Sequence, residues 1–190
     1  MKRIVIFASG SGSNAENIIK FFNHTKTATV TNVLCNNEQA KVFERCKNLK
    51  TKCLHFNKSD FETSDTVLNI LKNEADFIIL AGFLWRIPQK IIAAFPDKII
   101  NIHPALLPKY GGKGMYGMHV HKAVKENNEK ETGITIHYVN ANYDEGAIIY
   151  QVKTALNSQD TPETIAEKIH LLEHRYFPKV IEEVILAINE

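Results

Sequence analysis

The sequence predicts an α/β protein with a Rossmann-like, mostly parallel sheet, helices on both faces, and antiparallel strands added in the C-terminal part. Short apolar runs alternate with segments of helical spacing through residues 4–103, which is typical of parallel strands joined by helices. Three segments, 9–14, 82–86 and 101–103, lie at the carboxyl ends of such runs. Ligands gather beyond the carboxyl ends of such strands, so these segments are the first candidates for a site.

The predicted strands are rich in β-branched and aromatic residues. Residues 4–8 form a continuous apolar run, as expected for a strand buried on both faces. Residues 133–139 alternate in polarity and a polar turn leads from them into the last strand, so we expect an antiparallel pair there. The expected strands are 4–8, 29–35, 52–56, 77–81, 98–103, 133–139 and 147–154.

The predicted helices carry apolar residues three or four positions apart and begin at capping residues. Ser59-x-x-Glu62 is a capping box, and Pro88 suits the first position of a helix. The last helix begins at Asp160-Thr161-Pro162-Glu163, and Pro178 should kink or restart it. The expected helices are 15–22, 40–49, 59–73, 88–95, 119–127 and 160–187.

Length and composition indicate one ordinary globular domain. The chain has 190 residues, 44% hydrophobic and 23% charged, and its net charge of +2 gives no pull towards nucleic acid or a membrane. The apolar run at 4–8 is too short for a signal peptide or a membrane span. Cys35, Cys46 and Cys53 form no paired motif, so we expect neither a disulfide framework nor a zinc ribbon, and a reducing cytoplasm fits best.

A glycine-rich loop, Ser9-Gly10-Ser11-Gly12-Ser13-Asn14, joins the first strand to the first helix. Glycines allow close approach of the backbone and a helix start favours anions, so a phosphate or carboxylate could lie against Gly12, Ser13 and Asn14. The alternative is a tight turn whose polar residues only cap the helix. A dinucleotide is disfavoured, because Cys35-Asn36-Asn37 follows the second strand where a ribose-binding acid would be expected.

Asn101 and His103 lie two positions apart at the end of the fifth strand, so their side chains should share one face. An imidazole that exchanges protons near neutrality and an amide that hydrogen-bonds an oxyanion suit acyl chemistry. Neither a serine nor a cysteine nucleophile motif accompanies them, so the attacking atom should belong to a second substrate. The alternative for His103 is a hydrogen-bonded structural residue at a strand end.

Asp144, in Tyr143-Asp144-Glu145-Gly146, is the carboxylate that we would pair with His103, because an anion stabilises imidazolium and raises its pKa. The alternative for Asp144 is turn chemistry, the commoner fate of an aspartate two residues before glycine.

Three further features have weaker implications. Four glycines fall within Gly111 to Gly117, which predicts a mobile flap able to close over a ligand. His119-x-His121 has a spacing that metal sites use, but it lacks a further ligand, so no metal is expected. His137 alternates with Thr135 on a strand and should be packed or hydrogen-bonded.

The chain resembles the phosphoribosylglycinamide formyltransferases over nearly its whole length. The resemblance rests on Ser9-Gly10-Ser11-Gly12-Ser13-Asn14, Leu80-Ala81-Gly82-Phe83, Asn101-Ile102-His103-Pro104-Ala105-Leu106-Leu107-Pro108-Lys109 and Asp144-Glu145-Gly146, in that order. The Asn-x-His-Pro-x-Leu-Leu-Pro segment is common to a wider group that includes methionyl-tRNA formyltransferase and formyltetrahydrofolate deformylase. The glycine loop and the length narrow the resemblance to the purine family.

This resemblance implies that a formyl group passes from 10-formyltetrahydrofolate to the amine of 5-phosphoribosylglycinamide in purine biosynthesis, through a tetrahedral intermediate and without a metal. It implies a single domain with a phosphate-binding Rossmann-like half, 1–100, and a catalytic and folate-side half, 101–190. We expect these two small molecules as partners, no nucleic acid or membrane, and a cytoplasmic monomer or homodimer.

The resemblance also implies roles for individual residues. Asn101 and His103 would stabilise the oxyanion, with His103 as the proton donor, and Asp144 would raise the His103 pKa. Gly12, Ser13 and Asn14 would bind the substrate phosphate, and Glu173 would contact its ribose and glycinamide part. The folate side would be formed by Leu84, Trp85, Arg86, Ile87 and Asn101, with the turn 140–144 opposite.

Three positions depart from the family pattern. The segment 83–87 holds one residue more than usual, so either Leu84 or Trp85 faces the pterin. The loop 113–118 is longer than usual, and Ser64 stands where many relatives carry a basic residue near the folate tail.

Two other functions stay open at this point: a deformylase-like hydrolase that uses similar residues around water, and a non-catalytic phosphate- or nucleotide-binding module that uses only residues 9–14. We expect no N-terminal regulatory domain of the deformylase kind, because the first strand begins at Arg3. We likewise expect no C-terminal RNA-binding domain of the methionyl-tRNA formyltransferase kind.

Overall fold

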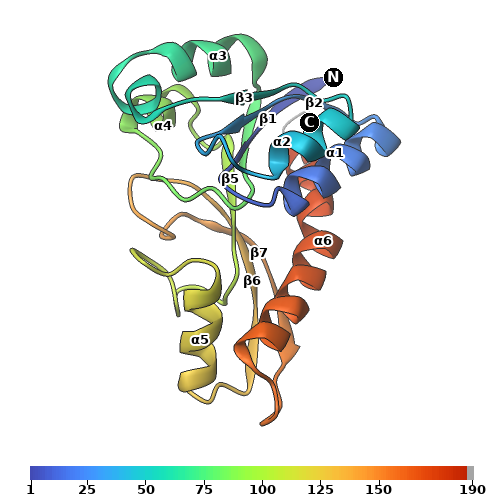
Figure 1. Cartoon of the computed structure of the whole chain (residues 1–190), viewed down its shortest axis with the longest axis vertical. Coiled ribbons are helices and arrows are strands. Elements are labelled where there is room, and N and C mark those ends of the chain that lie inside the picture. The colour runs from blue at the N-terminus through green and yellow to red at the C-terminus, as the bar shows by residue number, and fades with distance from the viewer. Residues whose placement is uncertain (188–190) are drawn as a thin grey trace. The chain divides into compact units, whose positions relative to one another are not determined.

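The computed structural model describes residues 1–187, and in them seven strands form a mixed sheet in the order β3-β2-β1-β4-β5-β6-β7 (Figure 1). Strand β1 pairs in parallel with β2 and β4, β2 pairs in parallel with β3, and β6 and β7 are antiparallel. The predicted fold class is confirmed. The strands are β1 (Lys2–Ala8), β2 (Ala28–Cys35), β3 (Cys53–His55), β4 (Phe77–Leu80), β5 (Ile99–His103), β6 (Glu131–Tyr138) and β7 (Ile148–Ala155).

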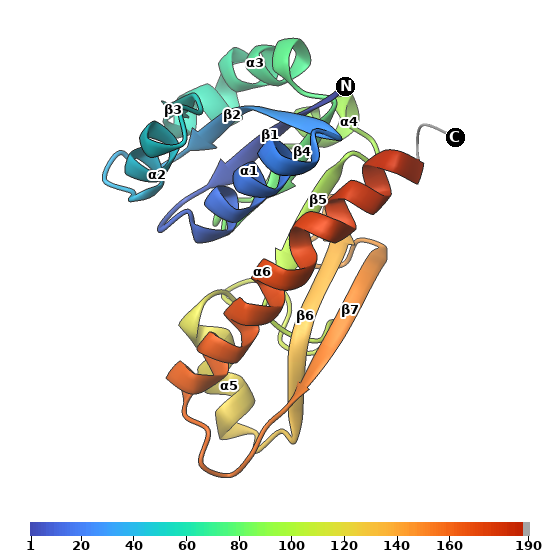
Figure 2. The same cartoon turned by 90° about the vertical axis from the view of Figure 1, so that its right-hand side faces the viewer.

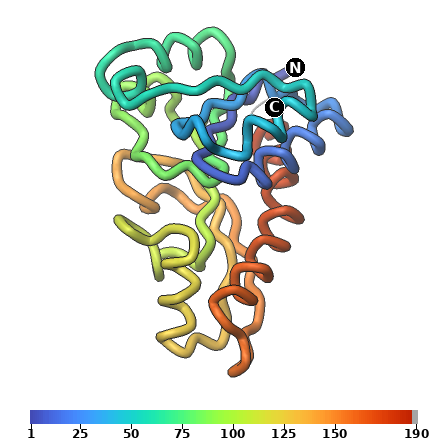
Figure 3. The backbone as a smooth tube through the Cα atoms, viewed as in Figure 1, coloured from blue at the N-terminus to red at the C-terminus, as the bar shows by residue number. Residues whose placement is uncertain are grey.

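Helices connect these strands, as the tube in Figure 3 allows the reader to follow along the chain. Among residues 1–187, no helix is both long and apolar enough to cross a membrane. The helices are α1 (Ser13–Thr25), α2 (Val42–Asn48), the short π-helix η1 (Ser59–Thr63), α3 (Thr66–Glu74), α4 (Gln89–Ala94), α5 (Met118–Glu126) and α6 (Pro162–Ala187).

The fold divides into two compact units, each described by itself. Unit one comprises Met1–Ile100 with the end of α6 from Ile181, and unit two comprises Asn101–Val180. In unit one, β1 lies at the centre of the core, because Ile4 to Ala8 are fully buried and α1 packs with its apolar face inward. In unit two, α6 runs beside the β6–β7 hairpin (Figure 2), where Tyr176 and Tyr150 stack with ring centroids 5.6 Å apart.

The predicted helix at 59–73 is in fact divided, and its predicted capping box is wrong. The helix η1 ends at Thr63, its C-cap Ser64 is extended with ψ 171°, and α3 begins at Thr66. No side chain of the described residues caps η1 at its assigned N-cap, and the reciprocal pair lies just before it. The Asp60 N–H donates to Asn57 Oδ1 at 2.9 Å, and the Asn57 N–H donates to Asp60 Oδ2 at 3.2 Å. An asparagine with an acid three residues later satisfies these N–H groups as a Ser–Glu box would.

Helix α6 continues through Pro178 to Ala187, so of the two outcomes predicted at this proline, a kink or a restart, the restart is wrong. A proline inside a helix removes one backbone hydrogen bond. Its neighbours Phe177 and Ile181 are fully buried, and burial of an apolar face contributes more to helix stability in a protein than local propensity does.

We predict that Asp60→Ala lowers the free energy of unfolding by about 1 kcal/mol, because it removes half of the reciprocal cap. Ser59→Ala is the matched control and should change it by less than about 0.5 kcal/mol. Urea denaturation followed by circular dichroism measures both. Equal losses in the two variants would contradict the assignment of the cap to Asn57 and Asp60.

Candidate active site

The loop of residues 9–14 lies between β1 and α1 in unit one. Gly12 is the N-cap of α1 with φ 72°, and a Cβ at this position would come 2.5 Å from Val42 Cγ2, so only glycine fits. Its carbonyl accepts a hydrogen bond from the Glu16 N–H at 2.8 Å, which starts the helix. As the N-cap residue, Gly12 has no side chain that could cap this start. An uncapped first turn after a glycine loop is a suitable place for a phosphate or carboxylate.

Helix α2 supports the same loop through Arg45. Its Nε donates to the Ser11 carbonyl at 2.8 Å, and its guanidinium also pairs with Glu16 in the first turn of α1. Lys20 pairs with Glu16 at 2.6 Å. The hydrogen bond from Lys20, followed by that from Arg45, lowers the pKa of the Glu16 carboxyl, against the effect of burial. Glu16, the acid in the first turn of α1, is therefore neutralised by two cations.

The segment Leu84 to Ile87, which was expected to line a pterin pocket, follows β4 in unit one. Trp85 lies with its ring centroid 5.9 Å from that of Phe56 and 6.0 Å from that of Phe61, so it belongs to an aromatic cluster. Leu84 is 53% exposed, whereas Ile87 is buried. Of the two residues left open by the sequence, Leu84 is the one that the unit presents to solvent.

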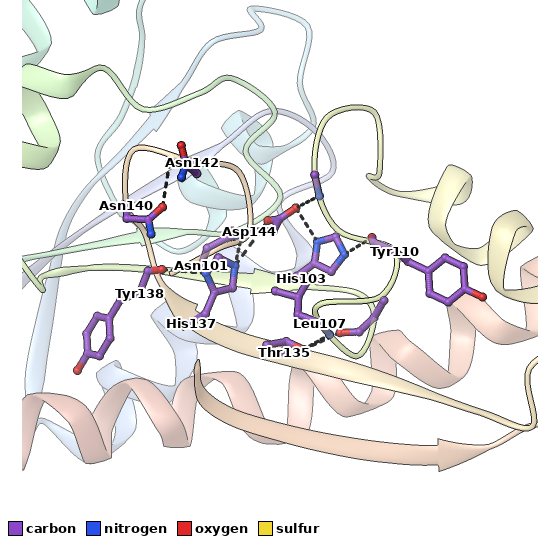
Figure 4. Close-up of polar contacts among 12 residues, drawn as sticks. Asn101, His103, Leu107, Tyr110, Thr135, His137, Tyr138, Asn140, Asn142 and Asp144 are labelled. Atoms are coloured by element: carbon purple, nitrogen blue, oxygen red, sulfur yellow. Dashed lines mark hydrogen bonds and ion pairs between the residues drawn. The ribbon is translucent and has the colours of Figure 1, made fainter. Parts of the chain in front are cut away.

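In unit two, the turn after β6 brings Asp144 to the end of β5, where Asn101 and His103 lie (Figure 4). His103 is buried, with 3% exposure. Its Nδ1 lies 3.5 Å from Asp144 Oδ2, and its Nε2 lies 2.7 Å from the backbone oxygen of Tyr110. A carbonyl only accepts hydrogen bonds, so Nε2 carries the proton that is donated to Tyr110, and Nδ1 faces the carboxylate.

Burial is the largest influence on His103 and lowers its pKa below the ordinary value. The charge of Asp144, the hydrogen bond to Tyr110 and the charge of Glu173 act in the opposite direction without cancelling it. Asp144 therefore acts on His103 in the predicted direction, but the net pKa is lowered because desolvation disfavours the charged ring more strongly.

The Asp144 carboxyl is also partly desolvated, and burial alone would raise its pKa. The His137 ring 3.6 Å from Oδ1, the charge of His103 and the N–H of Gly112, which donates to Oδ2 at 2.9 Å, together outweigh burial and lower it. Asp144 is therefore ionised near neutrality and would stabilise a second proton on His103 Nδ1.

His137 joins Asn101 to Asp144, which the sequence did not indicate. Asn101 Nδ2 donates to His137 Nε2 at 3.1 Å, and the same Nε2 lies 3.6 Å from Asp144 Oδ1. Its Nδ1 donates to the Tyr138 carbonyl at 2.9 Å, which leaves Nε2 to accept from the amide. The prediction of a hydrogen-bonded histidine is confirmed, and its site partners are new. The available signal was an ionisable side chain in the middle of a predicted strand.

Thr135, two positions before His137, braces the segment that follows His103. Its hydroxyl donates to the Ala105 carbonyl at 2.7 Å and accepts from the Leu107 N–H at 3.0 Å. Gln151 Nε2 adds bonds to the Thr135 hydroxyl at 2.8 Å and to the Leu107 carbonyl at 3.0 Å. The exit from β5 is thereby fixed to the β6–β7 hairpin.

Glu173 on α6 and His121 on α5 lie near this group in unit two. The charge of Glu173 raises the pKa of both His103 and His121, although burial, the larger effect, leaves each pKa lowered. His121 is 5% exposed, and its Nδ1 has no hydrogen-bond partner among the described residues. Within residues 1–187, no three His, Cys, Asp or Glu side chains are arranged to hold a metal ion.

Known proteins are similar to this chain over almost its full length. The family model described as Formyl transferase matches residues 2–181. Phosphoribosylglycinamide formyltransferase of Bacillus subtilis is 36% identical over 192 residues, and the match covers 97% of this chain and 95% of that protein. The chloroplastic phosphoribosylglycinamide formyltransferase of Arabidopsis thaliana is 37% identical over 187 residues, which are 95% of this chain and 64% of that protein.

Solved structures agree with the sequence matches. Glycinamide ribonucleotide transformylase 1 from Symbiobacterium toebii has a TM-score of 0.89 and 29% identity, covering 98% of this chain and 89% of that one. Phosphoribosylglycinamide formyltransferase from Bacillus halodurans has a TM-score of 0.86 and 34% identity, covering 97% of this chain and 95% of that one. With the family match spanning residues 2–181, these findings show that the chain belongs to the formyl transferase family.

Proposed function

We propose that the protein transfers the formyl group of 10-formyltetrahydrofolate to the amine of 5-phosphoribosylglycinamide, a step of de novo purine biosynthesis. The observation that carries this proposal is the group formed by the buried His103 and His137 with the half-buried Asn101 and Asp144, which offers an amide, imidazoles and an ionised carboxylate but no nucleophile. Relatives named for this activity match 95% or more of the chain and support the choice of substrates.

In the proposed reaction the substrate amine attacks the formyl carbon, and the carbonyl oxygen becomes an oxyanion. Asn101 and His103 stabilise that oxyanion, and Asp144 stabilises the proton that His103 carries on Nδ1. Collapse of the tetrahedral intermediate breaks the bond to the folate nitrogen, which gains a proton while the amine loses one. Asp144 helps to pass this proton through water. Both nitrogens come from the substrates, so the enzyme supplies position and charge.

Substrate binding is proposed for residues of each unit. In unit one, Gly12, Ser13 and Asn14 bind the phosphate, and Leu84, Arg86 and Ile87 contact the pterin. Leu84 takes the position nearest the pterin because Trp85 packs among Phe56 and Phe61. In unit two, Glu173 contacts the ribose and glycinamide part, and Asn101 also contacts the folate. We propose a monomer or homodimer that works in the cytoplasm.

The same imidazole and carboxylate could activate water instead of receiving an amine, which would give a deformylase-like hydrolase. One assay separates the two reactions: the full chain is mixed with 10-formyltetrahydrofolate, and folate absorbance is followed with and without 5-phosphoribosylglycinamide. Turnover that requires the ribonucleotide supports the transferase. Turnover without it supports the hydrolase, and no turnover in either mixture supports a module that only binds phosphate.

We predict that His103→Ala or Asn101→Ala lowers kcat by about 10²–10³-fold, as expected when one donor to an oxyanion is lost. The far-ultraviolet circular dichroism spectrum should be unchanged, because neither side chain fills a large volume of the core. Near-normal kcat in both variants would contradict the assigned roles.

We predict that Asp144→Asn moves the His103 pKa further below its ordinary value, because it removes the charge that most strongly opposes burial. A proton donor of lower pKa loses its proton at lower pH, so the high-pH limb of kcat should move to lower pH. Nuclear magnetic resonance titration of the ring measures the first effect, and the pH profile measures the second. A His103 pKa equal to that of the wild type would exclude the tuning role.

We predict that Gly12→Ala raises KM for the ribonucleotide about tenfold, because an alanine at φ 72° is strained by about 1–2 kcal/mol and would contact Val42. The KM for the folate should stay within about twofold. Gly10→Ala is the matched control, since a Cβ there meets nothing within 4 Å. Equal changes in both variants would argue against a phosphate at Gly12.

A further inference from the structure

The shortest contact of His103 is to a backbone atom, the Tyr110 carbonyl, 2.7 Å from Nε2. Because this carbonyl only accepts, it retains a proton on Nε2 in the neutral ring and in the imidazolium alike. The proton that comes and goes is then the one on Nδ1, which faces Asp144 at 3.5 Å. The carbonyl of Tyr110 thus decides which nitrogen of His103 titrates.

Tyr110 places its carbonyl there by adopting a left-handed backbone conformation with φ 57°. For a residue with a bulky side chain this conformation costs about 1–2 kcal/mol, so another interaction must hold it. The Tyr110 hydroxyl provides one, since it donates to Glu129 Oε1 at 2.9 Å. Glu129 lies in the connection between α5 and β6, and Lys109 also pairs with it at 2.9 Å.

The two residues after Tyr110 lie close to Asp144. Gly111 passes so close that a Cβ there would lie 2.6 Å from Leu107 Cδ2 and 3.3 Å from Asp144 Cβ. The Gly112 N–H then donates to Asp144 Oδ2 at 2.9 Å. Two backbone groups, the Tyr110 carbonyl and the Gly112 N–H, therefore hold the imidazole and the carboxylate, as the dashed contacts of His103 and Asp144 in Figure 4 show.

We propose that Tyr110 is a positioning residue: its hydroxyl, bound by Glu129, fixes its left-handed backbone, and its carbonyl orients His103 so that Nδ1 faces Asp144. This role rests on the proposed function only for its effect on catalysis. The orientation of the ring is a property of the ligand-free chain and is tested without any substrate.

The groups that set the charge of His103 come from every element around it. Asp144 from the turn after β6 and Glu173 from α6 favour the imidazolium, whereas His137 from β6 disfavours it. His121 from α5 is close enough for its own pKa to be lowered by the charge of His103. If the Tyr110 carbonyl moves away from Nε2, His103 loses a hydrogen bond that raises its pKa.

The test is Tyr110→Phe in the full chain labelled with ¹⁵N-histidine. In the wild type we expect the neutral His103 ring to be protonated on Nε2. In the variant we expect the Nδ1-protonated form to appear and the His103 pKa to fall. For the enzyme we expect kcat to fall about tenfold, since a small misplacement of a reacting group has effects of this size, while KM for both substrates stays within about twofold.

Three variants of the same contact serve as controls. Glu129→Ala should reproduce Tyr110→Phe, and Glu129→Gln should restore the wild-type ring, because the glutamine Oε1 still accepts from the hydroxyl. Lys109→Gln, which removes the cation and keeps the Tyr110–Glu129 bond, should leave the His103 signals unchanged.

The magnetic resonance result alone decides the role of Tyr110. A Tyr110→Phe chain with the wild-type tautomer and pKa of His103 would overturn the proposal, even if the variant were less stable. A wild-type chain with the expected ring but without formyl transfer would support the positioning role and contradict the proposed function. A shifted ring in Lys109→Gln as large as that in Tyr110→Phe would also overturn it.

Discussion

The partial burial of the Asp144 carboxylate between the imidazoles of His103 and His137 is the constraint on which unit two depends. A desolvated carboxylate is costly unless its oxygens are hydrogen-bonded or paired with charge. Asp144 Oδ1 faces His137, and Oδ2 faces His103 and the Gly112 N–H. These neighbours come from β6, β5 and the loop after β5, so the surroundings of the carboxylate depend on all three segments. The Gly112 N–H donates to it in the ligand-free chain, and His103 adds a second donor when Nδ1 is protonated.

Burial and the charges of neighbouring carboxylates act in opposite directions on the pKa of His103. In the ligand-free chain, burial lowers the His103 pKa more than the charge of Asp144 raises it, so this pKa lies below its ordinary value. The ionised Asp144 carboxylate lies beside Nδ1. In the proposed reaction a negative charge develops on the substrate oxygen, and that charge shifts the balance towards imidazolium. The site therefore binds the intermediate more strongly than the ground state, which is the condition for catalysis.

Much of the fold follows from local sequence. All seven strands lie within two residues of their expected positions, because apolar β-branched runs such as Ile4 to Ala8 can be buried only in a sheet. Prediction failed where several polar residues compete for the same N–H groups, as at the start of η1, where Asn57 and Asp60 form the cap. Of the kink or restart predicted at Pro178, the restart does not occur, because tertiary burial outweighs a local preference.

The sequence by itself determined the fold class, the glycine loop, the pair formed by Asn101 and His103, and the choice of Asp144 as their carboxylate, since each is a residue type at a recognisable position. Only the tertiary structure decided that His137 joins Asn101 to Asp144, that Thr135 braces the exit from β5, and that a backbone oxygen of Tyr110 selects the titrating nitrogen of His103. The contacts of His137 and Thr135 join residues 36 and 30 positions apart in the chain, and the Tyr110 contact is made by a carbonyl, a group present in every residue. Its direction depends on φ and on neighbours that packing alone brings together.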